Sequence, residues 1–212
     1  MGSMGSILFK HLEYTRLMRY LIELLCIVLI SLYTCICEAD PIIKKDDRIW
    51  LIGDSNGFLL MQELPKLAKV SGYNLKGNPV GGSSVISWSF QLNNRISVLN
   101  KFNPTVVLVC LGSNDAYMGP DIIKNEPMYL RMLLRKITKQ NRTIVWIGPP
   151  DLAKKRPGLE AFYQMVSPIP IIMYIDSRNI HIDMWDDLLH PSFAGRKVWA
   201  EWIWNQLVNQ NN

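Results

Sequence analysis

The sequence is poor in the residues that bind metals and cross-link small domains. It has only 4 cysteines and 3 histidines in 212 residues. Cys26, Cys35 and Cys37 lie in one apolar segment, and Cys110 lies in a run that is typical of a buried strand. This distribution gives neither a disulfide framework nor the spacing of metal ligands, so it argues against a disulfide-rich domain and against a zinc site.

The sequence also lacks a basic stripe interleaved with aromatic residues, which would indicate a nucleic-acid partner. Its formal net charge is +5, and 19% of its residues are charged. The basic residues stand in short clusters such as Lys44-Lys45 and Lys154-Lys155-Arg156, which are typical of a solvated surface. We therefore expect no nucleic acid among the partners.

One long apolar run stands near the N-terminus. From Tyr20 to Cys37 all but three residues are apolar, and basic residues precede the run. A membrane anchor needs roughly 20 apolar residues and a cleaved signal peptide needs fewer, so both interpretations fit. Either one would export the chain that follows. We predict an N-terminal signal peptide or membrane anchor over residues 1–39 and one exported domain over residues 40–212, either secreted or held at the membrane.

Short apolar runs alternate with longer amphipathic runs in the rest of the chain. Thr105–Leu111 is the clearest buried strand, because it is β-branched and unbroken. Gly57–Ser71 keeps one apolar face at helical spacing, and we expect this helix to kink or to start again at Pro65. The expected strands are Arg48–Ile52, Asn74–Val80, Thr105–Leu111, Thr143–Ile147 and Ile171–Ile175, and the expected helices are Gly57–Ser71, a stretch from Ser84 to about Phe102, Met128–Lys139 and Phe193–Val208. Strands separated by helices predict a three-layer α/β/α sandwich around a five-stranded parallel sheet.

The first expected strand ends in the turn Gly53-Asp54-Ser55-Asn56-Gly57. A serine at the end of a strand and the start of a helix lies where parallel α/β sheets keep their active sites, next to unpaired backbone N–H groups. The alternative is an ordinary turn in which Ser55 or Asn56 caps the helix. We expect Asp54 to fix the turn that presents Ser55. The turn also fits the G-x-S-x-G pattern of α/β-hydrolases, in which the serine follows a strand in the middle of the sheet and the acid and histidine lie on separate loops. Here the serine follows the first strand and the acid and base share one loop, so we interpret this match as coincidental.

Polar residues gather in four loops that follow expected strands. These loops are Gly53-Asp54-Ser55, Gly81-Gly82-Ser83, Gly112-Ser113-Asn114-Asp115 and Asp187-Leu188-Leu189-His190-Pro191. Because the carboxyl ends of parallel strands meet at one edge of the sheet, the four loops should converge on one crevice. They would bring together a serine to attack, a histidine to take its proton, an aspartate to orient the imidazole and amide donors for an oxyanion.

Alternatives to these residues stay open. Asp186 could replace Asp187 as the acid that orients the histidine. His181 with Asp183 offers a rival pair, although the strand-like surroundings of His181 favour a surface or core role. Asp115 is expected to support its own turn, and a direct role in the site stays open as well.

At these four blocks the exported domain resembles the SGNH hydrolase superfamily, also called GDSL esterases and lipases. The blocks stand in the order and spacing of that family along the whole of residues 40–212. The resemblance implies a flavodoxin-like α/β/α fold and a serine hydrolase. By resemblance Ser55 would be the nucleophile, His190 the base and Asp187 the acid that orients it.

The same resemblance implies an oxyanion hole with three donors. These would be the backbone N–H of Ser55, the backbone N–H of a glycine and the side-chain amide of Asn114. Gly82 is favoured over Gly81 as the glycine, because a pair of small serines follows it.

The reaction implied is ester hydrolysis through an acyl-enzyme, with no metal or organic cofactor. Because the loops are of modest length and no lid is evident, we expect a shallow, open site. Such a site suits a small acyl group, such as acetyl on a carbohydrate, better than a long lipid chain. Two alternatives remain, namely transfer of the acyl group to a sugar acceptor at the membrane and a non-catalytic binding module of the same fold. The sequence predicts no particular oligomeric state.

Overall fold

The computed structural model describes residues 16, 18–27, 41–118, 126–139, 142–152 and 156–209. The chain divides after Asp40 into an N-terminal unit and a larger unit. In the N-terminal unit, residues 18–27 form a helix with exposed side chains, and residues 1–15, 17 and 28–39 of the expected signal or anchor lie outside the described residues. No helix in the described part of the chain is long and apolar enough to cross a membrane.

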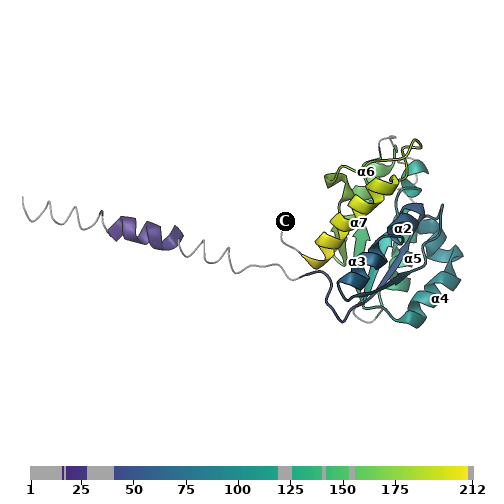
Figure 1. Cartoon of the computed structure of the whole chain (residues 1–212), viewed down its shortest axis with the longest axis horizontal. Helices are drawn as coiled ribbons and strands as arrows, with labels where there is room; N and C mark the ends of the chain where they lie inside the picture. The colour runs from purple at the N-terminus through teal and green to yellow at the C-terminus, as the bar shows by residue number, and fades with distance from the viewer. Residues whose placement is uncertain are drawn as a thin grey trace, which may run out of the picture. The chain divides into compact units, whose positions relative to one another are not determined.

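The larger unit is built on the predicted five-stranded parallel sheet (Figure 1). The strands are β1 (Arg48–Gly53), β2 (Asn74–Gly77), β3 (Val106–Cys110), β4 (Thr143–Ile147) and β5 (Ile172–Ile175), in the order β2-β1-β3-β4-β5. All neighbouring strands pair in parallel. The three inner strands are apolar and buried along almost their whole length, as a sheet covered on both faces requires.

Helices cover both faces of the sheet. They are α2 (Ser55–Leu60), α3 (Leu64–Val70), α4 (Asn93–Phe102), α5 (Glu126–Ile137), α6 (Leu159–Val166) and α7 (Phe193–Val208), with single turns η1 (Ser87–Gln91), η2 (Asp115–Met118) and η4 (Ser177–Asn179). Residues of β1 alternate between two cores, because successive side chains of a strand point to opposite faces. Leu51 packs with α2, α3 and α7, and Ile52 packs with α4, α5 and α6. The predicted three-layer sandwich is confirmed.

The expected helix Gly57–Ser71 is two helices, as Pro65 indicated. α2 starts earlier, at Ser55, and ends at Leu60, and α3 starts at Leu64. Pro65 lies in the first turn of α3, where a missing N–H removes no helical hydrogen bond. Because α2 starts early, Ser55 is the first residue of this helix.

One helix, α6, was not predicted from the sequence. This helix has only eight residues, and Leu159, Phe162, Tyr163 and Val166 are its buried side chains. Their spacing is that of one face of a helix, so the signal was present but short. α6 matters for the site because the backbone N–H of Gly158, just before it, donates to the carbonyl oxygen of Ala116 in η2 (3.0 Å).

Candidate active site

Ser55 stands where β1 passes into α2. At Gly53 the chain runs so close to β3 that a Cβ would come within 2.6 Å of the carbonyl oxygen of Cys110, so only glycine fits there. Asp54 then caps α2, accepting hydrogen bonds on Oδ1 from the N–H groups of Asn56 (2.8 Å) and Gly57 (3.4 Å). The backbone N–H of Ser55 donates to no described residue, as is usual in the first turn of a helix. This turn presents a half-buried hydroxyl beside an unused N–H group.

His190 lies directly against Ser55. Its Nε2 is 2.8 Å from Oγ of Ser55, and its Nδ1 is 2.6 Å from Oδ2 of Asp187. A neutral imidazole that donates from Nδ1 to the carboxylate keeps Nε2 free to accept the serine proton. Residues 135 positions apart in the chain thus form a continuous serine–histidine–aspartate chain of hydrogen bonds.

The carboxylate of Asp187 is fixed by its own turn. Its Oδ1 accepts hydrogen bonds from the backbone N–H groups of Leu189 (2.9 Å) and His190 (3.0 Å). Burial opposes ionisation, but these bonds and the imidazole outweigh it and lower the pKa of Asp187 to about 2. Leu188 adopts φ 55°, a left-handed conformation that a side chain disfavours. Such strain is typical of a turn that the surrounding structure holds for a function.

A small antiparallel clip closes the base of this loop. Met184 and Pro191 form a bridge, and the backbone N–H of Trp185 donates to the carbonyl of His190 (2.9 Å). Ser192 follows, and its hydroxyl caps α7 by accepting from the N–H of Gly195 (3.0 Å). His190 therefore lies directly before the Met184–Pro191 bridge and the start of α7, which hold its backbone in place.

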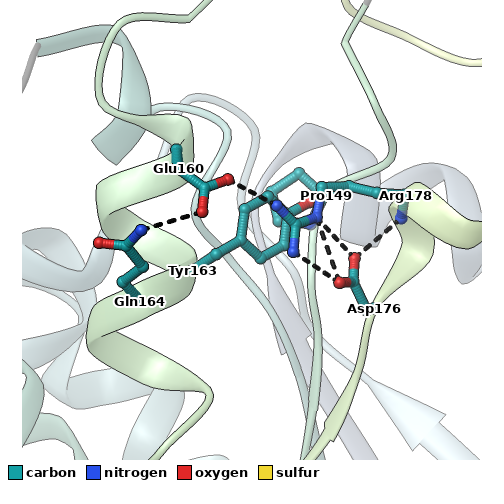
Figure 2. Close-up of polar contacts among 6 residues, drawn as sticks. All are labelled: Pro149, Glu160, Tyr163, Gln164, Asp176 and Arg178. Carbon is teal, nitrogen blue, oxygen red and sulfur yellow. Dashed lines mark hydrogen bonds and ion pairs between the residues drawn. The ribbon is translucent and has the colours of Figure 1, made fainter.

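A cluster of polar contacts around Arg178 holds the start of the segment that leads to His190 (Figure 2). Just after β5, the guanidinium of Arg178 bonds to Asp176 (2.6 Å) and to Glu160 of α6 (2.7 Å) and lies over the ring of Tyr163. The Tyr163 hydroxyl donates to the carbonyl of Pro149, after β4. This cluster ties the ends of β4, α6 and β5 together.

The other two predicted oxyanion donors, besides the N–H of Ser55, lie on two neighbouring loops. Asn114 donates one amide hydrogen to the carbonyl of Ser83 (2.9 Å), which leaves its second amide hydrogen for another acceptor. The backbone N–H groups of Gly81 and Gly82 donate to none of the residues described. Of these two glycines, only Gly82 has a left-handed backbone, with φ 71°. The geometry leaves both glycine N–H groups available.

Buried side chains that the sequence analysis did not assign tie these loops to the Ser55 turn. The amide of Asn56 donates to Oγ of Ser113 (2.8 Å), and the hydroxyl of Ser83 donates to the carbonyl of Gly53 (3.1 Å). Trp88 in turn donates its indole N–H to Ser83 (2.9 Å). The first two bonds join the turn after β1 to another loop, and the Trp88 bond fixes the Ser83 hydroxyl. In the sequence, the small polar residues beside the motif glycines were the only signal of these contacts.

Three alternatives are not supported. Asp54, rather than Ser55 or Asn56, provides the helix cap. Asp187, rather than Asp186, meets the histidine. His181 is exposed, and Asp183 instead accepts a hydrogen bond from Ser192 (2.8 Å). Within the described ranges, no three His, Cys, Asp or Glu side chains lie together as metal ligands would.

Asp54 is a fully buried acid, and burial raises its pKa from 3.8 to about 7 although two backbone N–H groups oppose the shift. The unfolded chain releases the Asp54 proton near pH 3.8, and the folded chain releases it near pH 7. The folded protein should therefore lose stability as the pH rises through this range.

Asparagine caps helices as well as aspartate but does not titrate, so Asp54→Asn should become more stable relative to the parent as the pH rises from about 4 to about 8. Asp54→Ala removes the cap and should lower the free energy of unfolding by about 1 kcal/mol at low pH. Urea unfolding at the two pH values measures both effects. An Asp54→Asn difference that is equal at both values would contradict the protonated buried acid.

The sequence matches no protein-family model, and no curated protein matches it. Solved structures do match. The psychrotrophic esterase EstA from Pseudoalteromonas sp. has 19% identity and a TM-score of 0.58, over 76% of this chain and 96% of that chain. The acetyl xylan esterase AlAXEase has 18% identity and a TM-score of 0.59, over 76% of this chain and 100% of that chain.

A third match is a transferase. It is the C-terminal catalytic domain of the peptidoglycan O-acetyltransferase A from Streptococcus pneumoniae, with 19% identity and a TM-score of 0.54 over 76% of this chain and 92% of that chain. At such identities a match shows the fold, and this chain has the α/β fold that the sequence blocks implied.

Proposed function

We propose that this chain, whose fold is that of the SGNH hydrolases, is a serine esterase that hydrolyses small acyl esters through an acyl-enzyme on Ser55. The observation that carries the proposal is the hydrogen-bonded series Asp187–His190–Ser55, with 2.6 Å and 2.8 Å between successive polar atoms. Such a series activates a hydroxyl that is otherwise a weak nucleophile.

In the proposed reaction, Oγ of Ser55 attacks the ester carbonyl carbon while Nε2 of His190 takes the hydroxyl proton. Negative charge moves to the carbonyl oxygen, and the unused N–H of Ser55, a glycine N–H and the second amide hydrogen of Asn114 can stabilise it. The charge of Asp187 stabilises the imidazolium, which then protonates the departing alcohol. Water repeats the sequence on the acyl-enzyme and releases the acid.

The exposure of the site supports a small acyl group on a bulky alcohol. The side chains of His190 and Asp187 are 29% and 43% exposed, so neither side chain is enclosed in a deep tunnel. Exposed rings stand near them in the chain. Tyr117 follows Asn114 in η2, and Trp185, on the clip beside His190, meets Phe193 edge to face. Guanidinium groups lie over the rings of Tyr117 and Phe193, so Trp185 is the ring that best offers a flat face to the apolar face of a sugar. We therefore propose a carbohydrate acetyl ester as the substrate class.

The acyl group is tested with 4-nitrophenyl esters. We expect the specificity constant for the acetate to exceed that for the decanoate by about tenfold or more, since an open site gives a long chain little to contact. Equal rates would contradict the small acyl group.

The Trp185 ring is tested with an acetylated xylo-oligosaccharide. Trp185→Ala should raise KM for this substrate several-fold and leave 4-nitrophenyl acetate hydrolysis unchanged. An equal effect on both esters would contradict a role of the Trp185 ring in binding the sugar.

Product analysis in the presence of a free sugar separates hydrolysis from acyl transfer. Release of acetate alone supports the esterase, and acetylation of the added sugar would instead indicate a transferase that uses the same acyl-enzyme.

We also propose that the domain acts outside the cytoplasm, because a long apolar run precedes it.

A further inference from the structure

Two buried acids lie behind the proposed oxyanion hole. Asp115 directly follows Asn114 and is 2% exposed, and Glu126, the first residue of α5, is 1% exposed. Oδ1 of Asp115 accepts a hydrogen bond from the backbone N–H of Val85, three residues beyond Gly82 (2.9 Å). Asp115 therefore forms a second tie between the two loops that Asn114 joins through Ser83.

The remaining oxygens of this pair have no hydrogen-bond donor at bonding distance among the described residues. Oδ2 of Asp115 and both carboxyl oxygens of Glu126 are buried, and none accepts a hydrogen bond from the described residues. No described lysine or arginine forms an ion pair with either carboxyl. The two carboxyl groups are neighbours that interact with each other. Two adjacent buried carboxylates would repel, so a single proton between them is the arrangement that this site allows.

We infer that Asp115 and Glu126 are positioning residues that share one proton and thereby hold the Gly82 and Asn114 loops of the oxyanion hole together. Glu126 carries the proton and donates it to Oδ2 of Asp115. That contact fixes the Asp115 carboxylate so that Oδ1 stays on the N–H of Val85. This positioning role rests on the proposed function, because the oxyanion-hole donors that the pair aligns would act on the ester.

The electrostatics agree with this geometry. Burial, and after it the Asp115 carboxyl, raise the pKa of Glu126 from 4.5 to about 9, and burial also raises the pKa of Asp115. The third acid nearby is Asp54, whose ionisation Asp115 disfavours and His190 favours. Loss of the shared proton leaves two adjacent negative charges, and the two loops should then separate.

The activity test compares the full chain with two variants on 4-nitrophenyl acetate. The parent should lose kcat above about pH 9, as Glu126 ionises. Glu126→Gln donates an amide hydrogen without titrating, so it should keep kcat within about threefold at pH 7 and lose the alkaline decline. Glu126→Ala leaves Asp115 without its donor and should lower kcat about tenfold or more while KM changes little.

Glu201 on α7 is exposed, and Glu201→Gln serves as the matched control that should keep the parent's pH profile. Circular dichroism confirms that each variant is folded. An unchanged alkaline decline in Glu126→Gln, or the parent's kcat in Glu126→Ala, would overturn the inference.

A stability measurement tests the shared proton without any substrate. The unfolded chain releases the Glu126 proton near pH 4.5 and the folded chain near pH 9, so the parent loses stability as the pH rises through this window. Glu126→Gln lacks that loss, and Asp54 contributes equally to both proteins. The difference in Tm, variant minus parent, should therefore increase from about pH 5 to about pH 8. A difference that does not change with pH would overturn the shared proton, whether or not the protein hydrolyses esters.

Discussion

Replacing Ser55 with alanine is expected to lower kcat for 4-nitrophenyl acetate by about 10⁴-fold or more, because the hydroxyl that forms the acyl-enzyme is lost. KM should change little, since the methyl group of alanine leaves the space around the site as it is. The fold should remain, because only the Ser55 hydroxyl, which bonds to His190, is removed. Initial rates near neutral pH, corrected for uncatalysed hydrolysis, measure the loss.

Ser97 on α4 provides a matched control. It is exposed, and its hydroxyl bonds only within its own helix, to the carbonyl of Asn93 (3.0 Å). Ser97→Ala should keep the parent's kcat. If Ser55→Ala retained more than a small fraction of the parent's rate, another group would have to be the nucleophile.

Replacing His190 with alanine is expected to cause a loss of the same order, about 10⁴-fold or more, because Ser55 then has no base to take its proton. Catalytic residues that act as one unit have effects that do not add. The double variant Ser55→Ala with His190→Ala should therefore be no slower than either single variant. Steady-state rates of the three proteins test both statements.

His181→Ala is the control for this second experiment, since His181 is exposed and forms no hydrogen bond with Ser55, Asp187 or His190. It should keep full activity. A large loss in His181→Ala together with a small loss in His190→Ala would contradict the assignment of the base.

The sheet was predictable because a strand that is buried on both faces needs an unbroken apolar run in the sequence. Val106–Cys110 is buried throughout, and the expected strand Thr105–Leu111 matches it within one residue at each end. α6 was missed because it has two turns and follows a stretch rich in proline and glycine. The π-helical turn η1 was expected only as part of a helix, because its geometry leaves no pattern in the sequence.

The candidate site was predictable where its residues stand in loops that follow expected strands. Ser55, His190 and Asp187 were expected together for that reason, and the structure brings them together. The supporting contacts were not predictable. The bond of Asn56 to Ser113 and the pairing of Glu126 with Asp115 join positions whose proximity arises only when the loops fold over the sheet.

Labelling with a fluorophosphonate tests the central claim most directly, because the reagent reacts with an activated serine and leaves a covalent adduct that intact mass spectrometry detects. We predict one adduct per chain, on the peptide that contains Ser55, with no adduct on Ser55→Ala and very slow labelling of His190→Ala. An unlabelled parent, or an adduct that persists in Ser55→Ala, would contradict the assignment of Ser55 as a nucleophile activated by His190.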